Sequence, residues 1–349
     1  METSEAGFRE RMKEESWRKI LLVRNDNIGD VLCTTPCFEI LRKHFPDAYI
    51  ALLVCSLTYE VVEGNPFLDK IFVYEKAKHA KSPRILAWLA QWRVLKEIRR
   101  EKFDLAINLR PDFSPSAARI VWASGARYRL GTQPVLKKHQ KWKFFYDIFI
   151  PYPSQALQHE VDRTCFLLSP LGVSLEEISK NLYFAIPTEL LSQAQKFFAS
   201  HSLPLHKAIC LHLGGRKEAN RFWRISNWAK LYQMLKKAGY SAFFTYTFSD
   251  RGDFQDLCHI LNEIPPNFCS HSLKAFGAIL KYAGLFIGVD GGAMHIAASL
   301  KVPCVIIFSK TSITRWHPWH VPQLCLQAED KNVNSILPEK VAKAVKQLL

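Results

Sequence analysis

The chain has 349 residues, and its 47 Lys and Arg against 32 Asp and Glu give a formal net charge of +15. Hydrophobic residues make up 48% and charged residues 23%, which is ordinary for a globular protein and excludes a disordered, collagen-like or coiled-coil chain. The length predicts two domains, and no apolar run reaches the ~20 residues of a membrane-spanning helix, which excludes a multi-span membrane protein.

The N-terminal segment and the cysteines indicate the compartment. Residues 1–19 contain no apolar segment of the kind found in signal peptides, and the nine cysteines include no Cys-x-x-Cys pair. We therefore expect a short N-terminal extension over 1–19 and a protein of the reducing cytoplasm, rather than a secreted chain held by disulfides.

In the first half, short runs of β-branched residues and leucine alternate with segments of helical periodicity. We expect strands at 20–24, 49–54, 70–74, 103–109 and 128–132. We expect helices at 31–44, 58–64, 84–100 and 114–123. Strands that alternate with helices predict a parallel sheet covered on both faces.

The second half repeats this pattern after a helix expected at 155–169 and a polar seam. Strands are expected at 208–213, 242–247, 285–290 and 303–308. Helices are expected at 189–200, 226–238, 253–262, 273–283 and 293–300. The fold class predicted is α/β, with two Rossmann-like, doubly wound domains over 20–170 and 171–335 facing a cleft, and an amphipathic helix over 336–349. Ligands bind such sheets at the carboxyl ends of the strands.

A first candidate site follows the first strand, in the sequence Asn-Asp-Asn-Ile-Gly-Asp that ends at Asp30. Asp30 opens a helix at a strand end, where a carboxylate can serve as a general base. Aspartate is also a favoured helix cap, and the residues alone leave both roles open. The chain lacks the Gly-x-Gly-x-x-Gly motif of dinucleotide-binding sites, so the sequence does not favour a dinucleotide-dependent oxidoreductase.

Two further loops carry features of phosphate-binding sites. One follows the strand at 208–213 and contains Gly214, Gly215, Arg216 and Arg221. It is either a phosphate loop or a solvated basic loop. The other contains Asp290, Gly291, Gly292 and His295, where a strand ends and a helix begins. Backbone N–H groups at that helix start would point at an anion, and Asp290 could accept sugar hydroxyls.

Two basic stretches with interleaved aromatic residues lie in the first half, at 76–102 and 137–152. The second contains Lys137, Lys138, Lys141 and Lys143, which we select as acceptor-binding residues. These stretches are either solvated faces or contacts with an anionic lipid surface. No nucleic-acid reader motif accompanies the charge, so nucleic acid is not expected as a partner. No complete metal-ligand set stands out, because Cys33 and Cys37 have no further ligands nearby in the sequence.

Three segments together resemble glycosyltransferase family 9, the ADP-heptose:lipopolysaccharide heptosyltransferases. They are NDNIGDVLCTTPCFEILRKHFPDAYIALLV, GGRKEANRFWRISNWAKL and GVDGGAMHIAASLKVPCVIIF, in the same order and spacing as in the family. The resemblance covers about residues 20–320. It implies a GT-B architecture and inverting, metal-independent transfer of a heptose from ADP-heptose to a lipopolysaccharide core acceptor, without a cofactor, at the cytoplasmic face of the inner membrane.

The resemblance also implies roles for individual residues. Asp30 falls on the catalytic base, Arg221 on a diphosphate-binding lysine, and Asp290 on the aspartate that contacts the sugar. Gly292 and His295 fall on diphosphate-contacting positions. This chain departs from the family with Arg221 in place of Lys, Arg224 in place of Pro, and Gly291 in place of Thr or Ser. The alternatives are a transferase or epimerase that uses another nucleotide sugar, and a catalytically silent sugar-nucleotide-binding relative.

Overall fold

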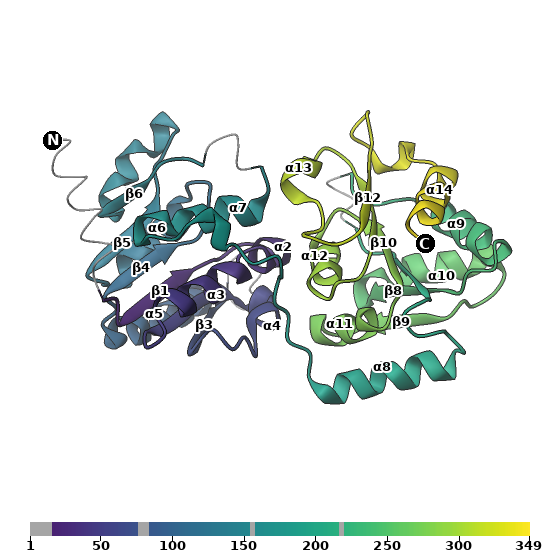
Figure 1. Cartoon of the computed structure of the whole chain (residues 1–349), viewed down its shortest axis with the longest axis horizontal. Coiled ribbons are helices and arrows are strands. Elements are labelled where there is room, and N and C mark those ends of the chain that lie inside the picture. Colours follow the sequence, from purple (N-terminus) through teal and green to yellow (C-terminus); the bar gives the residue numbers. More distant parts are fainter. Residues whose placement is uncertain (1–15, 76–83, 154–157, 216–219) are drawn as a thin grey trace. The chain divides into compact units, whose positions relative to one another are not determined.

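The computed structural model describes residues 16–75, 84–153, 158–215 and 220–349, with residues 84–88 described as backbone only (Figure 1). The chain divides into two compact units, one ending at Tyr183 and the other spanning Phe184–Leu349. The division therefore falls later than the boundary expected at 170. The reason is that the connecting segment bonds back to the first unit, where His44 and Glu177 approach to 2.6 Å and the Tyr183 N–H donates to the Thr35 hydroxyl. The cleft expected between the domains stays a prediction.

The first unit is built on a six-stranded parallel sheet with the strand order β3-β2-β1-β4-β5-β6. Its strands are β1 (Lys19–Val23), β2 (Tyr49–Cys55), β3 (Lys70–Tyr74), β4 (Leu105–Asn108), β5 (Tyr128–Thr132) and β6 (Ile148–Ile150). Its α-helices are α2 (Ile28–Leu32), α3 (Thr35–His44), α4 (Tyr59–Val62), α5 (Arg84–Glu101), α6 (Pro115–Ala123) and α7 (Glu160–Cys165). Its 3-10 helices are η1 (Ser56–Thr58), η2 (Lys137–Phe145), η3 (Phe166–Leu171) and η4 (Leu175–Glu177).

The second unit has the strand order β12-β11-β10-β7-β8-β9, again all parallel. Its strands are β7 (Ile209–His212), β8 (Ala242–Thr247), β9 (Asn267–Ser270), β10 (Leu285–Val289), β11 (Cys304–Phe308) and β12 (Gln323–Gln327). Its α-helices are α8 (Thr188–Ser200), α9 (Ile225–Lys237), α10 (Arg251–Leu261), α11 (Leu273–Lys281), α12 (Gly292–Ser299), α13 (Ile313–Trp316) and α14 (Pro338–Leu348). Short 3-10 helices are η6 (Phe248–Asp250) and η7 (Val333–Ser335).

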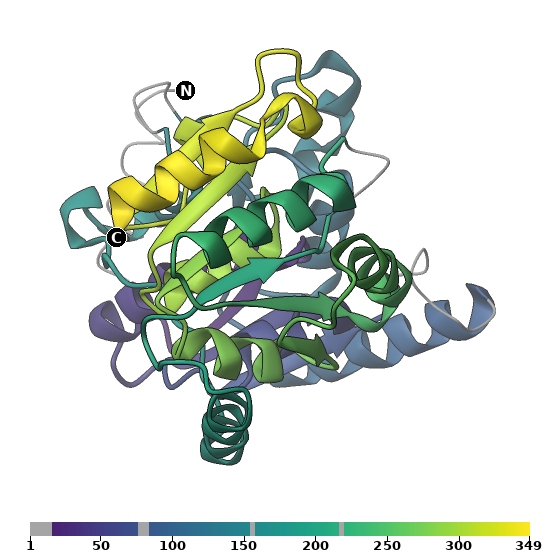
Figure 2. The same ribbon diagram turned by 90° about the vertical axis from the view of Figure 1, so that its right-hand side faces the viewer.

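The central strands of both sheets are buried on both faces, which explains their continuous apolar sequences. In the second unit, α9 and α14 lie side by side over one face (Figure 2), and their apolar residues join one core with Trp223 and Trp228. The C-terminal helix is therefore part of the second unit. Within the described ranges, no helix combines the length and the apolar character needed to cross a bilayer.

Three strands escaped the sequence analysis: β6, β9 and β12. All three are edge strands. β9 and β12 consist mostly of partly exposed, partly polar residues, and β6 is only three residues long, too short to show a periodic pattern. The helix expected at 31–44 is divided into α2 and α3 at Cys33 and Thr34. Residues 155–157 of the helix expected at 155–169 lie outside the described residues; from Glu160 on, the segment forms α7, which η3 continues as a 3-10 helix containing Pro170.

Candidate functional site

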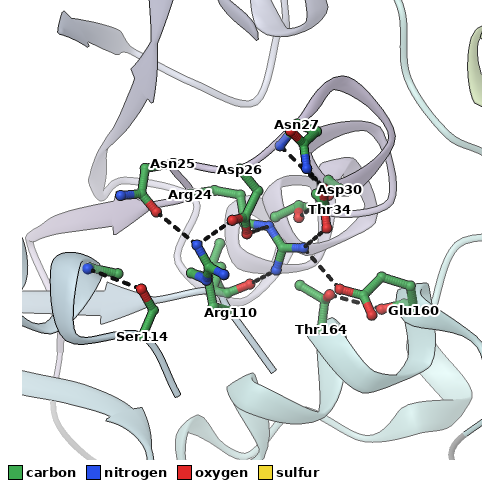
Figure 3. A network of polar contacts seen from close by, with 12 residues as sticks. Arg24, Asn25, Asp26, Asn27, Asp30, Thr34, Arg110, Ser114, Glu160 and Thr164 are labelled. Atoms are coloured by element: carbon green, nitrogen blue, oxygen red, sulfur yellow. Dashed lines mark hydrogen bonds and ion pairs between the residues drawn. The ribbon is translucent and has the colours of Figure 1, made fainter. Parts of the chain in front are cut away.

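Asp30 lies in the first turn of α2, directly beyond the carboxyl end of β1 (Figure 3). Its Oδ2 accepts hydrogen bonds from the backbone N–H of Asn27 at 3.2 Å and from the Asn27 side-chain amide at 3.1 Å. Its Oδ1 lies 3.3 Å from Nη2 of Arg24. The N-cap of α2 is Asn27 rather than Asp30, and Asp30 takes part in the capping box from the third helical position. Its side chain still exposes 19% of its surface.

The guanidinium of Arg24 is buried at the end of β1 and is surrounded by carboxylates (Figure 3). Its Nη2 donates to Glu160 Oε1 at 2.9 Å as well as to Asp30, and its Nη1 donates to the carbonyl of Leu109. Its Nε lies 3.2 Å from Asp26 Oδ2. Burial disfavours the charged form, but the carboxylates of Asp26, Glu160 and Asp30 outweigh it and raise the pKa of Arg24 above its usual range.

A cavity of about 990 Å³ in the first unit begins beside this network. At its polar end, Arg110 pairs with Asp26 and lies 3.4 Å from the side-chain oxygen of Asn25. Burial raises the pKa of Tyr74, another lining residue, to about 12, so its hydroxyl stays protonated near neutral pH. The opposite walls are aromatic and include Trp92, Trp122, Phe144 and Phe145. Polar groups beside aromatic walls suit a sugar, which presents hydroxyls at its edge and C–H groups on its face.

The four lysines selected from the sequence, Lys137, Lys138, Lys141 and Lys143, all lie exposed on η2. None of them lines the cavity, whose cations are Arg110 and Arg119. Their segment packs against α6, where the Arg119 guanidinium and the Lys141 ammonium both lie over the ring of Trp142, at 5.2 and 5.4 Å from its centroid.

The two basic aromatic stretches meet around this cavity. Trp92 on α5, Trp122 on α6 and Phe144 on η2 all line it, and they are 52%, 49% and 62% exposed. Residues 76–83, with Lys76, Lys78 and Lys81, lie outside the described residues. We call the exposed cationic and aromatic surface of α5, α6 and η2 the aromatic–basic surface; it comprises Trp92, Arg119, Trp122, Lys137, Lys138, Lys141, Lys143 and Phe144.

In the second unit, the loop after β7 is shaped by its two glycines. A Cβ on Gly214 would overlap the imidazole of His212, and a Cβ on Gly215 would overlap the carbonyl oxygen of Arg221. Arg216 lies outside the described residues. Arg221 donates through Nη2 to the Thr311 hydroxyl at 2.9 Å, and its Nη1 lies 3.4 Å from Asp290 Oδ2. The backbone at Gly215 and at Arg221 is therefore close together, and the Arg221 guanidinium lies at the end of β10.

The third predicted segment joins Arg221 at this point. Asp290 follows β10 and is buried, and its Oδ2 has no aligned hydrogen-bond donor among the described residues. Gly291 is extended, and a Cβ there would meet only the Val289 carbonyl oxygen at 3.8 Å, an ordinary contact. Gly292 begins α12. His295 is buried in the first turn of α12, edge-on to Trp316 with ring centroids 6.0 Å apart.

Sequence reasoning missed Arg24, Glu160, Arg110 and Thr311. Arg24 could have been predicted, because it directly follows an apolar strand and an arginine buried there needs buried partners. Glu160 had no comparable signal, since its partner lies 136 positions away. In the described part of the chain, no group of three or more His, Cys, Asp or Glu residues is arranged to hold a metal ion.

The family model of glycosyltransferase family 9 (heptosyltransferase) matches residues 91–344. Lipopolysaccharide heptosyltransferase 3 of Escherichia coli is 25% identical over 300 residues, a match that covers 83% of each chain. A family 9 glycosyl transferase from Veillonella parvula has a TM-score of 0.83 at 23% identity and covers 96% of this chain and 98% of its own.

The solved structure of the E. coli heptosyltransferase WaaC with ADP-2-deoxy-2-fluoro heptose has a TM-score of 0.74 at 17% identity, with 94% of this chain and 99% of that one covered. These likenesses, together with the two parallel sheets, confirm the predicted GT-B fold of two Rossmann-like units. The family model spans well over half of the chain and ends within α14. The chain is thus a member of glycosyltransferase family 9, the heptosyltransferase family.

Proposed function

We propose that the protein transfers a heptose from ADP-heptose to a lipopolysaccharide core acceptor, with inversion and without a metal ion. The observation that carries this proposal is the pair of strand-end sites: a partly exposed carboxylate, Asp30, in the first unit, and a cation beside a buried carboxylate and a helix start in the second. The names of the relatives supply the sugar and the acceptor, since they include a lipopolysaccharide heptosyltransferase and a heptosyltransferase solved with an ADP-heptose analogue.

The second unit is proposed to bind the donor. Arg221 and the N–H groups at the start of α12, around Gly291 and Gly292, supply positive charge for the diphosphate. Gly214 and Gly215 belong to the neighbouring loop, and Arg216, which lies outside the described residues, is proposed as a further cation for the diphosphate. His295, in the first turn of α12, is proposed to contact the diphosphate. Asp290 accepts hydrogen bonds from hydroxyls of the sugar, which would give its Oδ2 the aligned donor that Arg221 does not supply.

The first unit is proposed to bind the acceptor, with the cavity beside Asp26 and Arg110 holding its terminal sugar. Asp30 removes the proton from the acceptor hydroxyl, whose oxygen attacks the anomeric carbon of the heptose. The bond from that carbon to the diphosphate oxygen breaks, and ADP leaves with the electron pair. Attack from the opposite face inverts the anomeric centre. Arg221 stabilises the leaving charge that a metal ion would otherwise neutralise.

The aromatic–basic surface is proposed to contact the cytoplasmic face of an anionic membrane, where an amphiphilic acceptor is anchored. Each Lys or Arg near such a surface contributes about 1 kcal/mol of attraction, and exposed Trp and Phe side chains enter the headgroup region. The surface adjoins the cavity, because Trp92, Trp122 and Phe144 belong to both. A lipid-anchored acceptor could therefore reach the cavity without leaving the membrane.

The test is turnover with ADP-heptose and a purified, heptose-deficient lipopolysaccharide acceptor, followed by mass spectrometry of the product and by ADP release. Asp30→Asn should lower kcat by roughly 10²- to 10⁴-fold with an unchanged dissociation constant for ADP. Asp47→Asn, at an exposed aspartate of the same unit, is the matched control and should keep full activity. Normal turnover by Asp30→Asn would leave Asp30 as a helix cap only. Conversion of the donor without acceptor would indicate an epimerase, and binding without turnover a silent relative.

A further inference from the structure

We propose that Glu160 is a positioning residue for glycosyl transfer, which keeps Asp30 basic by competing with it for the buried guanidinium of Arg24. The inference rests on the proposed role of Asp30 as the base. It concerns a residue on α7, a helix that contributes no side chain to the cavity.

The geometry of Arg24 makes this competition explicit (Figure 3). One nitrogen, Nη2, donates to both carboxylates: to Glu160 Oε1 at 2.9 Å and to Asp30 Oδ1 at 3.3 Å. The side chains of Arg24 and Glu160 each expose 1% of their surface, whereas Asp30 exposes 19%. The shorter and drier contact is the stronger one, because water does not screen it. Glu160 thus takes the larger share of the charge of Arg24, and Asp30 is left loosely paired.

The other contacts of Arg24 fix its orientation. Its Nη1 donates to the Leu109 carbonyl, and its Nε lies 3.2 Å from Asp26 Oδ2 without an aligned hydrogen bond among the described residues. These contacts fix the plane of the Arg24 guanidinium. They therefore also fix the direction from which its Nη2 contacts Asp30 Oδ1. Asn27 holds Asp30 Oδ2 from the other side. The carboxylate is thus oriented by Asn27 and by an ion pair with Arg24 that is longer than the one Glu160 makes.

Glu160 is itself held in a defined place. It is the first residue of α7, where the His159 ring caps the helix by accepting from the Val161 N–H at 3.1 Å. The Thr164 hydroxyl donates to the Glu160 carbonyl at 2.8 Å (Figure 3). On the far side of α7, the sulfur of Cys165 lies 3.4 Å from that of Cys37 on α3, the helix that follows the Asp30 turn. The helix that carries Glu160 thus packs against the helix that follows the Asp30 turn.

The charges around Asp30 support the same inference. Among the described residues, the charged and titratable groups around Asp30 and its partner Arg24 are Asp26 after β1, Glu160 from α7 and Cys33 directly after α2, with Arg110 beyond Asp26. Burial, and then the negative charges of Glu160 and Asp30, raise the pKa of the Cys33 thiol well above its usual value, so it stays neutral. Three carboxylates thus share two guanidinium groups. Without Glu160, Arg24 would pair with Asp30 directly and weaken it as a base.

The experiment is a kinetic double-mutant cycle on the full chain, with wild type, Glu160→Gln, Asp30→Asn and the double variant assayed under saturating donor and acceptor. Glutamine keeps the size of the side chain and an oxygen for Arg24 but removes the charge. We expect Glu160→Gln to lower kcat roughly 3- to 100-fold with an unchanged ADP dissociation constant. We expect no further loss when it is added to Asp30→Asn.

The pH profile of kcat/KM separates positioning from a merely structural role. In Glu160→Gln the acidic limb should move to lower pH, because one negative neighbour fewer favours the ionised base. Glu39→Gln is the control: it removes one carboxylate from the same unit, where Glu39 pairs only with Lys43 in the ion pairs of the described chain, and it should leave rate and profile unchanged. If Glu160→Gln fails to fold, Glu160→Asp should give a smaller shift in the same direction.

The outcomes distinguish this inference from the proposed function. If Asp30→Asn turns over normally, the proposed base is wrong. If Asp30→Asn is slow but Glu160→Gln lowers the rate equally in both backgrounds, Glu160 does not act through Asp30. An unshifted acidic limb in a folded Glu160→Gln protein also overturns the inference.

Discussion

Gly215 lies directly against the backbone of Arg221, so that any side chain on Gly215 would overlap the Arg221 carbonyl oxygen. This close approach turns the chain back at the end of β7 and places the Arg221 guanidinium beside Thr311 and Asp290. The glycine thus acts on the donor site through backbone packing, whereas the sequence suggested that it meets a phosphate.

Gly215→Ala should displace Arg221 and weaken the binding of ADP by about 10-fold or more, because a charge-assisted hydrogen bond contributes about 1.5–3 kcal/mol. Isothermal titration calorimetry with ADP measures this directly. Gly252→Ala is the matched control: a Cβ there meets nothing within 4 Å, and the residue lies in α10. Equal ADP affinity in both variants would show that the loop position is unimportant.

Arg221→Ala should weaken donor binding by about 10- to 150-fold for the same reason. Arg221→Lys should recover most of the loss, since a single charge is restored, although a lysine cannot contact Thr311 and Asp290 with two separate nitrogens. A fluorescence or calorimetric titration of the three proteins with ADP orders their affinities. If the alanine variant binds ADP as wild type does, Arg221 is a solvated residue.

Gly291→Ser should fold normally and bind ADP about 2- to 10-fold more tightly. The backbone at Gly291 is extended and there is room for a Cβ, and a hydroxyl beside the start of α12 adds one hydrogen-bond donor of about 0.5–1.5 kcal/mol. Gly288→Ser is the contrasting control, because its Cβ would lie 2.7 Å from the Phe286 ring; its melting temperature should fall. Weaker ADP binding by Gly291→Ser would mean that the open space is itself used by the donor.

Reversal of Lys137, Lys138, Lys141 and Lys143 to Glu should reduce binding to anionic vesicles and leave ADP affinity intact, because none of the four lines the cavity. Vesicle binding of the wild type should weaken as salt rises past ~0.15 M, where the Debye length is about 8 Å. Co-sedimentation provides the measurement. The control reverses four exposed lysines of the second unit, Lys196, Lys237, Lys340 and Lys343, for the same change in charge. If both variants lose vesicle binding equally, the binding depends on the net charge of the protein and not on the aromatic–basic surface.

His212 makes the stability of the second unit depend on pH. Burial lowers the pKa of this histidine to about 4 from an ordinary 6.5, so the unfolded chain takes up its proton first as the pH falls. Stability is therefore lost between pH 6.5 and 4, by about 2 kcal/mol at pH 5. The difference in unfolding free energy between wild type and His212→Gln should shrink by that amount from pH 7.5 to 5 in urea titrations. A constant difference would show that His212 ionises normally.

The sequence was sufficient for the alternation of strands and helices, because buried parallel strands carry uninterrupted apolar runs such as the one at β10. It was insufficient for the edge strands: most residues of β9 and β12 are partly solvated, and β6 has only three residues. Asp30, Arg221 and Asp290 could be selected because each follows a strand or a glycine turn. Glu160 could not, since its importance depends on a tertiary contact with Arg24. The lysines of η2 were selected by charge, and only the fold shows that the cavity beside them is lined by arginines instead.

The buried Arg24 also constrains how the first unit folds. Its strongest counter-ion is supplied 136 residues later in the chain, so every strand of the sheet has been synthesised before Glu160 emerges from the ribosome. Until α7 docks, a guanidinium enclosed by the sheet lacks its closest partner, and an incompletely paired buried charge costs several kcal/mol. We expect nascent chains that end at β6 to remain protease-sensitive and chains that extend past α7 to become resistant in one cooperative step. The contact between Arg24 and Glu160, which we propose keeps Asp30 basic, would then form only when the first unit is complete.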